Sequence, residues 1–268
     1  MSSSTNKNEI HVGILGAMPE EIGTALKDLN EVVTSEYGDL TIYSGKWKGY
    51  SELNQITIYL SIAWSGWGKV SSSRASTRLI SKIYKNKKID LILFTGVAGA
   101  IDPTLNQWDV ILPNKLIQHD MNATPIFNKY VIPALKKIYL EPKKELHNGI
   151  LNILQNVKII NKSWPFKKIL KGTIATGDQF ISDKISLNKL RNSIKGVLAV
   201  EMEGAAVAQV GEQENVPWII IRVISDGADD NASESFQQFI SSYEKYSWNL
   251  VTEILKSLPK DFIDCLKN

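Results

Sequence analysis

The chain has little cysteine and no long hydrophobic run. Cys265 is the single cysteine among 268 residues, so neither an intramolecular disulfide nor a cysteine-based zinc site is possible within the chain, and we expect a cytoplasmic protein. Nowhere do 18 uncharged apolar residues follow one another, which argues against a membrane span. The polar start MSSSTNKNE has no apolar segment behind it, which argues against a secretory signal.

An excess of charge of one sign is also missing. The 31 Lys and Arg residues nearly balance the 28 Asp and Glu residues, so the net charge is +3. The lysines are scattered in short pieces without interleaved aromatic residues, and we therefore expect no nucleic-acid partner. The hydrophobic share of 43% and the charged share of 22% exclude disordered, collagen-like and coiled-coil chains.

Signatures of metal sites and of nucleophilic catalysis are lacking as well. His11, His119 and His147 do not have metal-ligand spacing among themselves. Neither G-x-S-x-G nor H-E-x-x-H occurs, and SGWGKVSSS and HVGILGAM depart from the phosphate-binding and dinucleotide-binding patterns. Carboxylates are therefore the main candidates for catalytic groups in this sequence.

Apolar runs rich in Val and Ile alternate with helical patterns, which is typical of an α/β protein with buried, largely parallel strands. Strands are predicted to begin at His11, Ile56, Asp90, Asp109, Ile169, Gly196 and Trp218. Helices are predicted over residues 20–29, 70–84, 145–156, 184–193, 204–214 and 233–258. Because no linker or repeat interrupts this order, we predict one domain over residues 10–268 after a polar tail at residues 1–9.

Acidic residues follow three of the predicted strands. They occur in Pro19-Glu20-Glu21, in Glu201-Met202-Glu203 and in Ser225-Asp226. Ligands of open α/β sheets bind where the carboxyl ends of the strands meet, and buried carboxylates are costly unless something binds them. A solvated role at a helix start is the alternative for the first two groups.

Two further segments have open interpretations. The small-residue turn TGVAGA at residues 95–100 either lets backbone N–H groups approach a ligand or allows tight packing of a strand on a helix. The segment over residues 122–146 is the least regular part of the chain and holds three prolines. A long loop in a compact domain is typical of a lid, an interface or a disordered piece.

Five segments together resemble one family. GILGAMPEEI, TGVAGAI, ATGDQFI, AVEMEGAAVAQV and RVISDGAD, in this order and at these separations, are similar to the 5′-methylthioadenosine/S-adenosylhomocysteine nucleosidases of the purine nucleoside phosphorylase superfamily. The resemblance covers residues 12–258. It implies a nucleoside phosphorylase-like fold: a single-domain three-layer sandwich with a mixed, largely parallel, twisted central sheet flanked by helices.

The resemblance also implies an activity, a partner and an assembly. The activity is hydrolysis of the N-glycosidic bond of a 5′-thio-substituted adenosine, which releases adenine and the thioribose. The partner is this small-molecule nucleoside, neither a metal nor an organic cofactor is implied, and a homodimer is expected.

Residue by residue, the matching motifs imply the following roles. Glu21 matches the base that activates water, Asp226 the acid that protonates adenine N7, and Glu203 the carboxylate that binds the ribose hydroxyls. The remaining substrate-binding matches are Met18, Trp67, Gly99, Phe180, Ile181, Met202, Arg222, Ser225 and Phe236.

The family pattern is not kept at four positions, Pro19, Trp67, Val97 and Ala100, nor in one loop. Val97 stands where a serine is usual, and Trp67 stands where a smaller aliphatic residue lines the pocket of the 5′ substituent. The preferred 5′ substituent is therefore open, as is cleavage of an aminodeoxyfutalosine-like nucleoside. The loop over residues 122–133 matches poorly a family segment that crosses a dimer interface.

Two other functions remain as hypotheses for the same fold. A phosphate-dependent phosphorylase needs cationic or hydroxyl groups around phosphate, and Val97 supplies none. A nucleoside-binding or storage protein without turnover does not need the acids Glu21 and Asp226, which the chain keeps.

Overall fold

The computed structural model describes residues 9–49 and 56–258. The predicted tail, apart from Glu9, and Cys265 lie outside these residues. The strands are β1 (Glu9–Gly16), β2 (Leu29–Tyr37), β3 (Leu40–Trp47), β4 (Thr57–Trp64), β5 (Leu91–Ala100), β6 (Val110–Gln118), β7 (Tyr139–Leu140), β8 (Ile169–Thr176), β9 (Val197–Glu201) and β10 (Trp218–Asp226). The helices are α1 (Lys69–Ile80), α2 (Lys144–Ile160), α3 (Lys184–Ser193), α4 (Gly204–Gln213) and α5 (Ala232–Ser257), with 3-10 turns η1 (Pro19–Glu21) and η2 (Ala25–Asp28).

The sheet is mixed, and part of it closes on itself. β5 pairs with β10 and β1 in parallel, and β6 with β8 and β8 with β9 in parallel. The pairs β10–β6 and β9–β5 are antiparallel and join these strands into a barrel-like ring. The α/β class and the mixed sheet are confirmed. The prediction that the sheet is largely parallel and simply twisted is wrong, because several strand pairs are antiparallel and two of them close the ring, which covers strand edges.

The segment after β1 differs most from the prediction. A helix was expected over residues 20–29, but the chain forms η1 and η2 and then the hairpin of β2 and β3. Gly23 has a φ of +57°, and a side chain there would meet the carbonyl oxygen of Glu244 and Ser247 Oγ on α5. This backbone conformation interrupts the helix at Gly23, and the close contact fixes η1 against α5.

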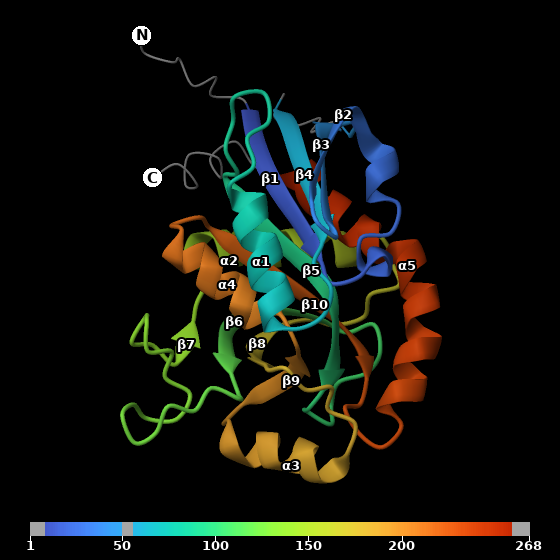
Figure 1. The fold of residues 1–268 in the computed structure, drawn as a ribbon. Coiled ribbons are helices and arrows are strands. Elements are labelled where there is room, and N and C mark those ends of the chain that lie inside the picture. The colour runs from blue at the N-terminus through green and yellow to red at the C-terminus, as the bar shows by residue number, and fades with distance from the viewer. Residues whose placement is uncertain (1–8, 50–55, 259–268) are drawn as a thin grey trace.

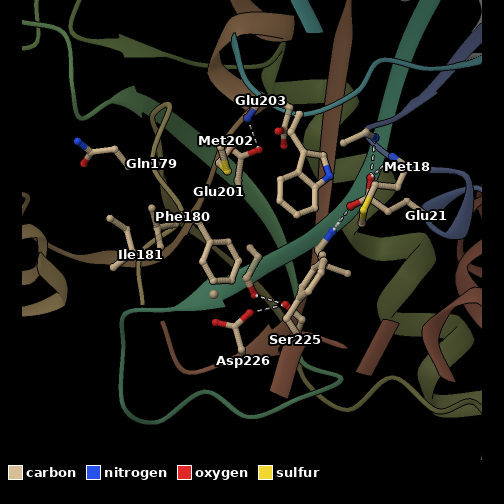
Figure 2. A pocket seen from close by; sticks show the side chains of 17 residues that line it. Met18, Glu21, Gln179, Phe180, Ile181, Glu201, Met202, Glu203, Ser225 and Asp226 are labelled. Atoms are coloured by element: carbon tan, nitrogen blue, oxygen red, sulfur yellow. Dashed lines mark hydrogen bonds between the residues drawn. The ribbon is translucent and has the colours of Figure 1, made fainter. Parts of the chain in front are cut away.

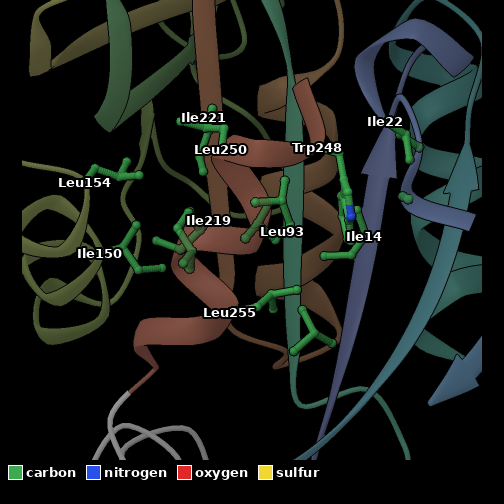
Figure 3. Packing of buried hydrophobic residues seen from close by; sticks show 14 of the residues in the cluster. Ile14, Ile22, Leu93, Ile150, Leu154, Ile219, Ile221, Trp248, Leu250 and Leu255 are labelled. Atoms are coloured by element: carbon green, nitrogen blue, oxygen red, sulfur yellow. The ribbon is translucent and has the colours of Figure 1, made fainter. Parts of the chain in front are cut away.

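Strand β5 is buried on both faces, as the continuous apolar run predicts. Leu91 and Leu93 belong to the hydrophobic cluster that includes residues of α2 and α5 (Figure 3). Ile92 and Phe94 point the other way, into the cluster that includes residues of α1 and α4. Figure 1 shows α5 on the opposite side of the sheet from α1 and α4.

The register brings four strand ends together. Asp226 of β10 lies opposite Gly99 of β5, and Gly99 lies opposite Val200 of β9. β1 runs beside β5 and ends at Gly16, just before η1. The acids at or after the ends of β1, β9 and β10 therefore lie around one edge of the sheet.

None of the described helices combines the length and the apolar composition that a membrane span requires.

Candidate active site

A cavity opens where the ends of β1, β5, β9 and β10 meet (Figure 2). Figure 2 shows Met18 and Glu21 on one side of it, Phe180 and Ile181 on the other, and Ser225 and Asp226 at one end. The predicted site residues that line it are Met18, Glu21, Trp67, Gly99, Phe180, Ile181, Met202, Glu203, Ser225, Asp226 and Phe236. Arg222 does not line the cavity and lies fully buried behind its carboxylates.

Some lining residues were not among the predicted ones: Ala17, Val97, Ala98, Gln179, Val200 and Glu201. Most of them are direct chain neighbours of predicted residues. Glu201 differs from the others because it adds a fourth carboxylate to the cavity, beside those of Glu21, Glu203 and Asp226. Its signal in the sequence is the alternation within Glu201-Met202-Glu203, which directs both acids to one side of the strand.

Glu21 is buried and held by backbone donors. Its Oε2 accepts from the N–H of Ala17 at 2.6 Å and of Met18 at 3.2 Å, and its Oε1 accepts from the N–H of Val97 at 3.0 Å. Burial raises the pKa of this carboxyl, and the nearby Arg222 guanidinium and the three N–H donors oppose that rise. The carboxylate therefore has a fixed orientation and a proton affinity above that of an exposed glutamate.

Gly96 makes room for this arrangement. A β-carbon at position 96 would collide with both Glu21 Oε1 and Arg222 Nη1. The two atoms therefore point at the same space beside the Gly96 α-carbon. In the described chain, Arg222 Nη1 has no hydrogen-bond partner.

Asp226 lies at the other end of the cavity. Its Oδ2 accepts from Ser225 Oγ at 2.7 Å and its Oδ1 from the N–H of Ala228 at 2.8 Å. Burial raises the pKa of Asp226, the two hydrogen bonds lower it, and the charge of Asp229 adds to the rise. A β-carbon at Gly99 would lie 2.8 Å from Asp226 Oδ1, so this close approach requires glycine.

Glu203 faces the cavity from the start of α4. Its Oε1 accepts from the N–H of Gly68 at 2.8 Å, and its Oε2 lies 3.7 Å from Arg222 Nη2. Burial raises the pKa of Glu203 to about 8, the charges of Glu201 and Glu21 add to this rise, and Arg222 and the Gly68 N–H oppose it. The raised pKa reflects a crowded group of carboxylates that shares one guanidinium.

Aromatic rings form one wall. The Phe236 ring contacts the Trp67 ring edge to face at a centroid distance of 6.0 Å, and it contacts Phe180 in the same way at 6.0 Å. Trp67 is 50% exposed and Phe180 is 40% exposed. Exposed aromatic faces beside a cavity supply stacking surfaces for a flat, apolar ligand.

The polar groups of the lining are acids, hydroxyl and amide groups. None of the described lining residues is Lys, Arg or His, so a bound polyanion would meet carboxylates without a cation in contact. Among the residues that the structure describes, no group of three or more His, Cys, Asp or Glu side chains is arranged to hold a metal ion.

The comparisons with known proteins agree on one family. A sequence profile of the phosphorylase superfamily matches residues 11–256. An aminodeoxyfutalosine nucleosidase of Campylobacter jejuni is 33% identical over 247 residues, which cover 92% of this chain and 99% of that protein. A 5′-methylthioadenosine/S-adenosylhomocysteine nucleosidase of an Exiguobacterium species is 32% identical over 248 residues, which cover 92% of this chain and 98% of that protein.

A solved structure extends the likeness to three dimensions. The S-adenosylhomocysteine nucleosidase from Streptococcus pyogenes, in complex with 5-methylthiotubericidin, matches with a TM-score of 0.80 and 28% sequence identity. The match covers 94% of this chain and 98% of that chain. The chain therefore belongs to the phosphorylase superfamily and, within it, to the family of the 5′-methylthioadenosine/S-adenosylhomocysteine nucleosidases, which are N-glycosyl hydrolases.

Proposed function

We propose that the chain hydrolyses the N-glycosidic bond of 5′-thio-substituted adenosines, with Asp226 as general acid, Glu21 as general base and Glu203 as the carboxylate that binds the ribose. The observation that carries this proposal is that these three acids, which are far apart in the sequence, line one cavity. Each of them has a pKa raised by burial, which is typical of groups that exchange protons at neutral pH.

Asp226 delivers a proton to the purine in this mechanism. Adenine leaves poorly as an anion, and protonation of its N7 lowers the barrier to bond breaking. An acid can donate only while it is protonated, and burial favours the protonated form of Asp226. Phe180 and Ile181 line the same cavity and supply apolar surface for the purine faces.

Glu21 activates the water that attacks the anomeric carbon. Its carboxylate is fixed by the N–H groups of Ala17, Met18 and Val97, so little reorganisation is needed when it takes a proton. A raised pKa makes it a stronger base than an exposed glutamate once it is ionised.

Glu203 accepts hydrogen bonds from the ribose hydroxyls. As the glycosidic bond breaks, the sugar gains oxocarbenium character, and the negative charge of the ionised form of Glu203 stabilises it. Met202, the next residue in the chain, lines the cavity beside it and offers apolar surface to the sugar.

Water, and not phosphate, is the nucleophile in this proposal. Glu21, Glu201 and Glu203 line the cavity, and no cation is found among the described lining residues. A phosphate dianion would be repelled there. Val97 likewise offers no hydroxyl group, and its N–H already donates to Glu21.

A second substrate is favoured by a specific observation. The relative from Campylobacter jejuni is named an aminodeoxyfutalosine nucleosidase, and the paired rings of Trp67 and Phe236 suit a flat 5′ group. We include this nucleoside in the proposed substrate range.

We also propose that the chain forms a homodimer, and sedimentation of the purified protein would test this.

Adenine release tests the proposal. Purified protein is incubated with 5′-methylthioadenosine in phosphate-free buffer, and the products are separated by chromatography. Release of adenine in an equal amount to the thioribose supports hydrolysis. A protein that binds the nucleoside without releasing adenine would support the binding or storage hypothesis instead.

A further inference from the structure

Glu201 is a buried carboxylate that the proposed mechanism does not use. It is 6% exposed. Its Oε2 accepts from Arg222 Nη2 at 2.6 Å and from Arg222 Nε at 3.2 Å. The same oxygen accepts from the N–H of Glu203 at 3.0 Å and of Gly204 at 2.7 Å. One oxygen of Glu201 thus joins the guanidinium to the first turn of α4.

The other oxygen of Glu201 is fixed by Thr176. Thr176 Oγ1 donates a short hydrogen bond to Glu201 Oε1, and the same hydroxyl oxygen accepts from the N–H of Ala205 at 2.9 Å. Thr176 is fully buried and does not line the cavity. The hydroxyl therefore holds both the carboxylate and the start of α4 from behind the site.

Arg222 connects Glu201 with the two carboxylates that we assign to the reaction. Its Nη2 pairs with Glu201 and lies 3.7 Å from Glu203 Oε2, and its Nη1 faces the same space as Glu21 Oε1. The Phe94 ring lies under the guanidinium at 4.0 Å and leaves it little freedom on that side. Since the group is fully buried, these charges interact more strongly than at a surface.

We propose that Glu201 is a positioning residue, which fixes Arg222 and the Glu203–Gly204 turn so that Glu203 and Glu21 keep their orientation and charge balance during nucleoside cleavage. This inference rests on the proposed function. Glu201 acts through Arg222 and through the α4 backbone, and it does not need to touch the substrate.

The charge of Glu201 has a predictable effect on its neighbours. The groups that face Glu203 are Glu201, Arg222 and Glu21. Those that face Glu21 include Arg222 and, on α5, Tyr243. Removal of the Glu201 charge lowers the pKa of Glu203 and frees Arg222 to act on Glu21. Asp226 is surrounded by other groups, namely Ser225, Ala228 and Asp229, so its titration should not change.

The first experiment uses Glu201→Gln and the pH profile of kcat/KM. In wild type, the acid limb reports deprotonation of Glu21 and Glu203, and the basic limb reports the acid Asp226. We expect Glu201→Gln to move the acid limb to lower pH by at least half a unit, roughly what loss of one buried charge produces, with the basic limb unchanged. A profile that is only scaled down, with both limbs in place, would show a structural role and overturn the proposal.

The second experiment keeps the Glu201 charge and removes the hydrogen bond that Thr176 donates to it. Thr176→Val should lower kcat/KM by about tenfold or more, since a misplaced catalytic group costs up to about a hundredfold, whereas Thr176→Ser should restore it. Thr173→Val is the matched control on the same strand, and it should retain wild-type kcat/KM. Equal activity of the Thr176→Val and Thr173→Val proteins would contradict the inference.

A binding measurement separates this inference from the proposed function. A carbon-linked analogue of adenosine binds but cannot be hydrolysed, so its Kd is measured against pH for wild type and Glu201→Gln. If wild type releases no adenine, the proposed function fails, yet a shifted pH dependence of Kd in Glu201→Gln still supports the role of Glu201. Identical pH dependences would refute that role, whether or not adenine is released.

Discussion

Gly68 donates its N–H to Glu203 Oε1 at 2.8 Å, which ties the residue after Trp67 to the carboxylate that we assign to the ribose. On the other side of Trp67, the N–H of Gly66 donates to the carbonyl of Ala17 at 3.0 Å. Gly66 and Gly68 both have positive φ, +78° and +91°, a conformation that suits glycine. Trp67 is thus held between the segments that carry Glu21 and Glu203.

The first prediction concerns Trp67→Ala. Trp67 lies beyond the ribose carboxylate, so its ring should contact the 5′ substituent, and an apolar contact of this size is worth about 1–3 kcal/mol. We expect kcat/KM for 5′-methylthioadenosine to fall about tenfold or more and kcat/KM for S-adenosylhomocysteine, whose charged end stays hydrated, to fall less. A competition assay with both nucleosides measures the ratio. Val70→Ala, at a residue that is 81% exposed, is the control. Wild-type kcat/KM for both nucleosides in Trp67→Ala would show that Trp67 is not part of the substrate site.

The second prediction concerns Glu21→Gln. The amide cannot accept a proton from water, so turnover should fall by about 10²- to 10⁴-fold. The melting temperature should fall as well, because in either orientation the buried amide NH₂ group faces a backbone N–H donor, that of Ala17 or that of Val97. Steady-state adenine release and thermal unfolding provide the two measurements. Glu20→Gln alters the preceding residue, which does not line the cavity, and should keep wild-type activity. Comparable losses in both variants would mean that Glu21 is not the base.

The third prediction concerns the pH dependence that Asp226 imposes. Because its pKa is raised in the folded protein, the acid stays protonated to higher pH than an exposed aspartate, and activity should decline as pH rises through that pKa. Asp229 adds to the rise, so Asp229→Asn should move the basic limb of kcat/KM to lower pH. Asp226→Asn should abolish most activity at every pH. A basic limb that Asp229→Asn leaves in place would assign the limb to another group.

The fourth prediction concerns folding stability and His11. His11 is fully buried, its Nε2 lies 2.8 Å from Ser61 Oγ and its Nδ1 3.1 Å from the Lys87 carbonyl. Burial lowers the pKa of His11 from 6.5 to about 4. Unfolding then takes up a proton between these values, so the free energy of unfolding should decrease as pH falls from about 7 to about 4.

The shift in the pKa of His11 predicts that the free energy of unfolding decreases by about 3 kcal/mol over this pH range. Urea unfolding of wild type and His11→Gln across this pH range measures it as the difference between the two slopes. His119, whose pKa burial also lowers, contributes equally to both proteins and cancels. Parallel pH dependences for the two proteins would show that His11 titrates alike in the folded and unfolded states.

The sequence was informative where local pattern and burial agree. The runs of Val and Ile predicted β5, β6 and β10, and α3 begins and ends at the predicted residues. Closure of the ring was not predictable in this way, because the antiparallel pairs β9–β5 and β10–β6 depend on contacts between segments far apart in the chain. The hairpin of β2 and β3 was missed because β2 is exposed along most of its length and so has no continuous apolar run that would indicate a strand.

The candidate site was likewise predicted only in part. Motif similarity pointed to Glu21, Glu203 and Asp226, and all three line one cavity. Arg222 was expected at the substrate, but it lies behind the acids. Its partner Glu201 was recognised as an acid at a strand end but was given no role. Nothing local in the sequence distinguishes a carboxylate that contacts a ligand from one that holds an arginine, because the difference depends on which strand lies beside it.

The most direct measurement follows the oxygen atom in the released sugar. Wild type and Glu21→Gln are incubated with 5′-methylthioadenosine in ¹⁸O-labelled water that contains phosphate, and the sugar product is analysed by mass spectrometry. We expect wild type to release adenine and a thioribose with one ¹⁸O atom at its anomeric carbon, and we expect Glu21→Gln to form almost none. Formation of a thioribose 1-phosphate, or labelled thioribose at an equal rate from both proteins, would contradict the proposed function.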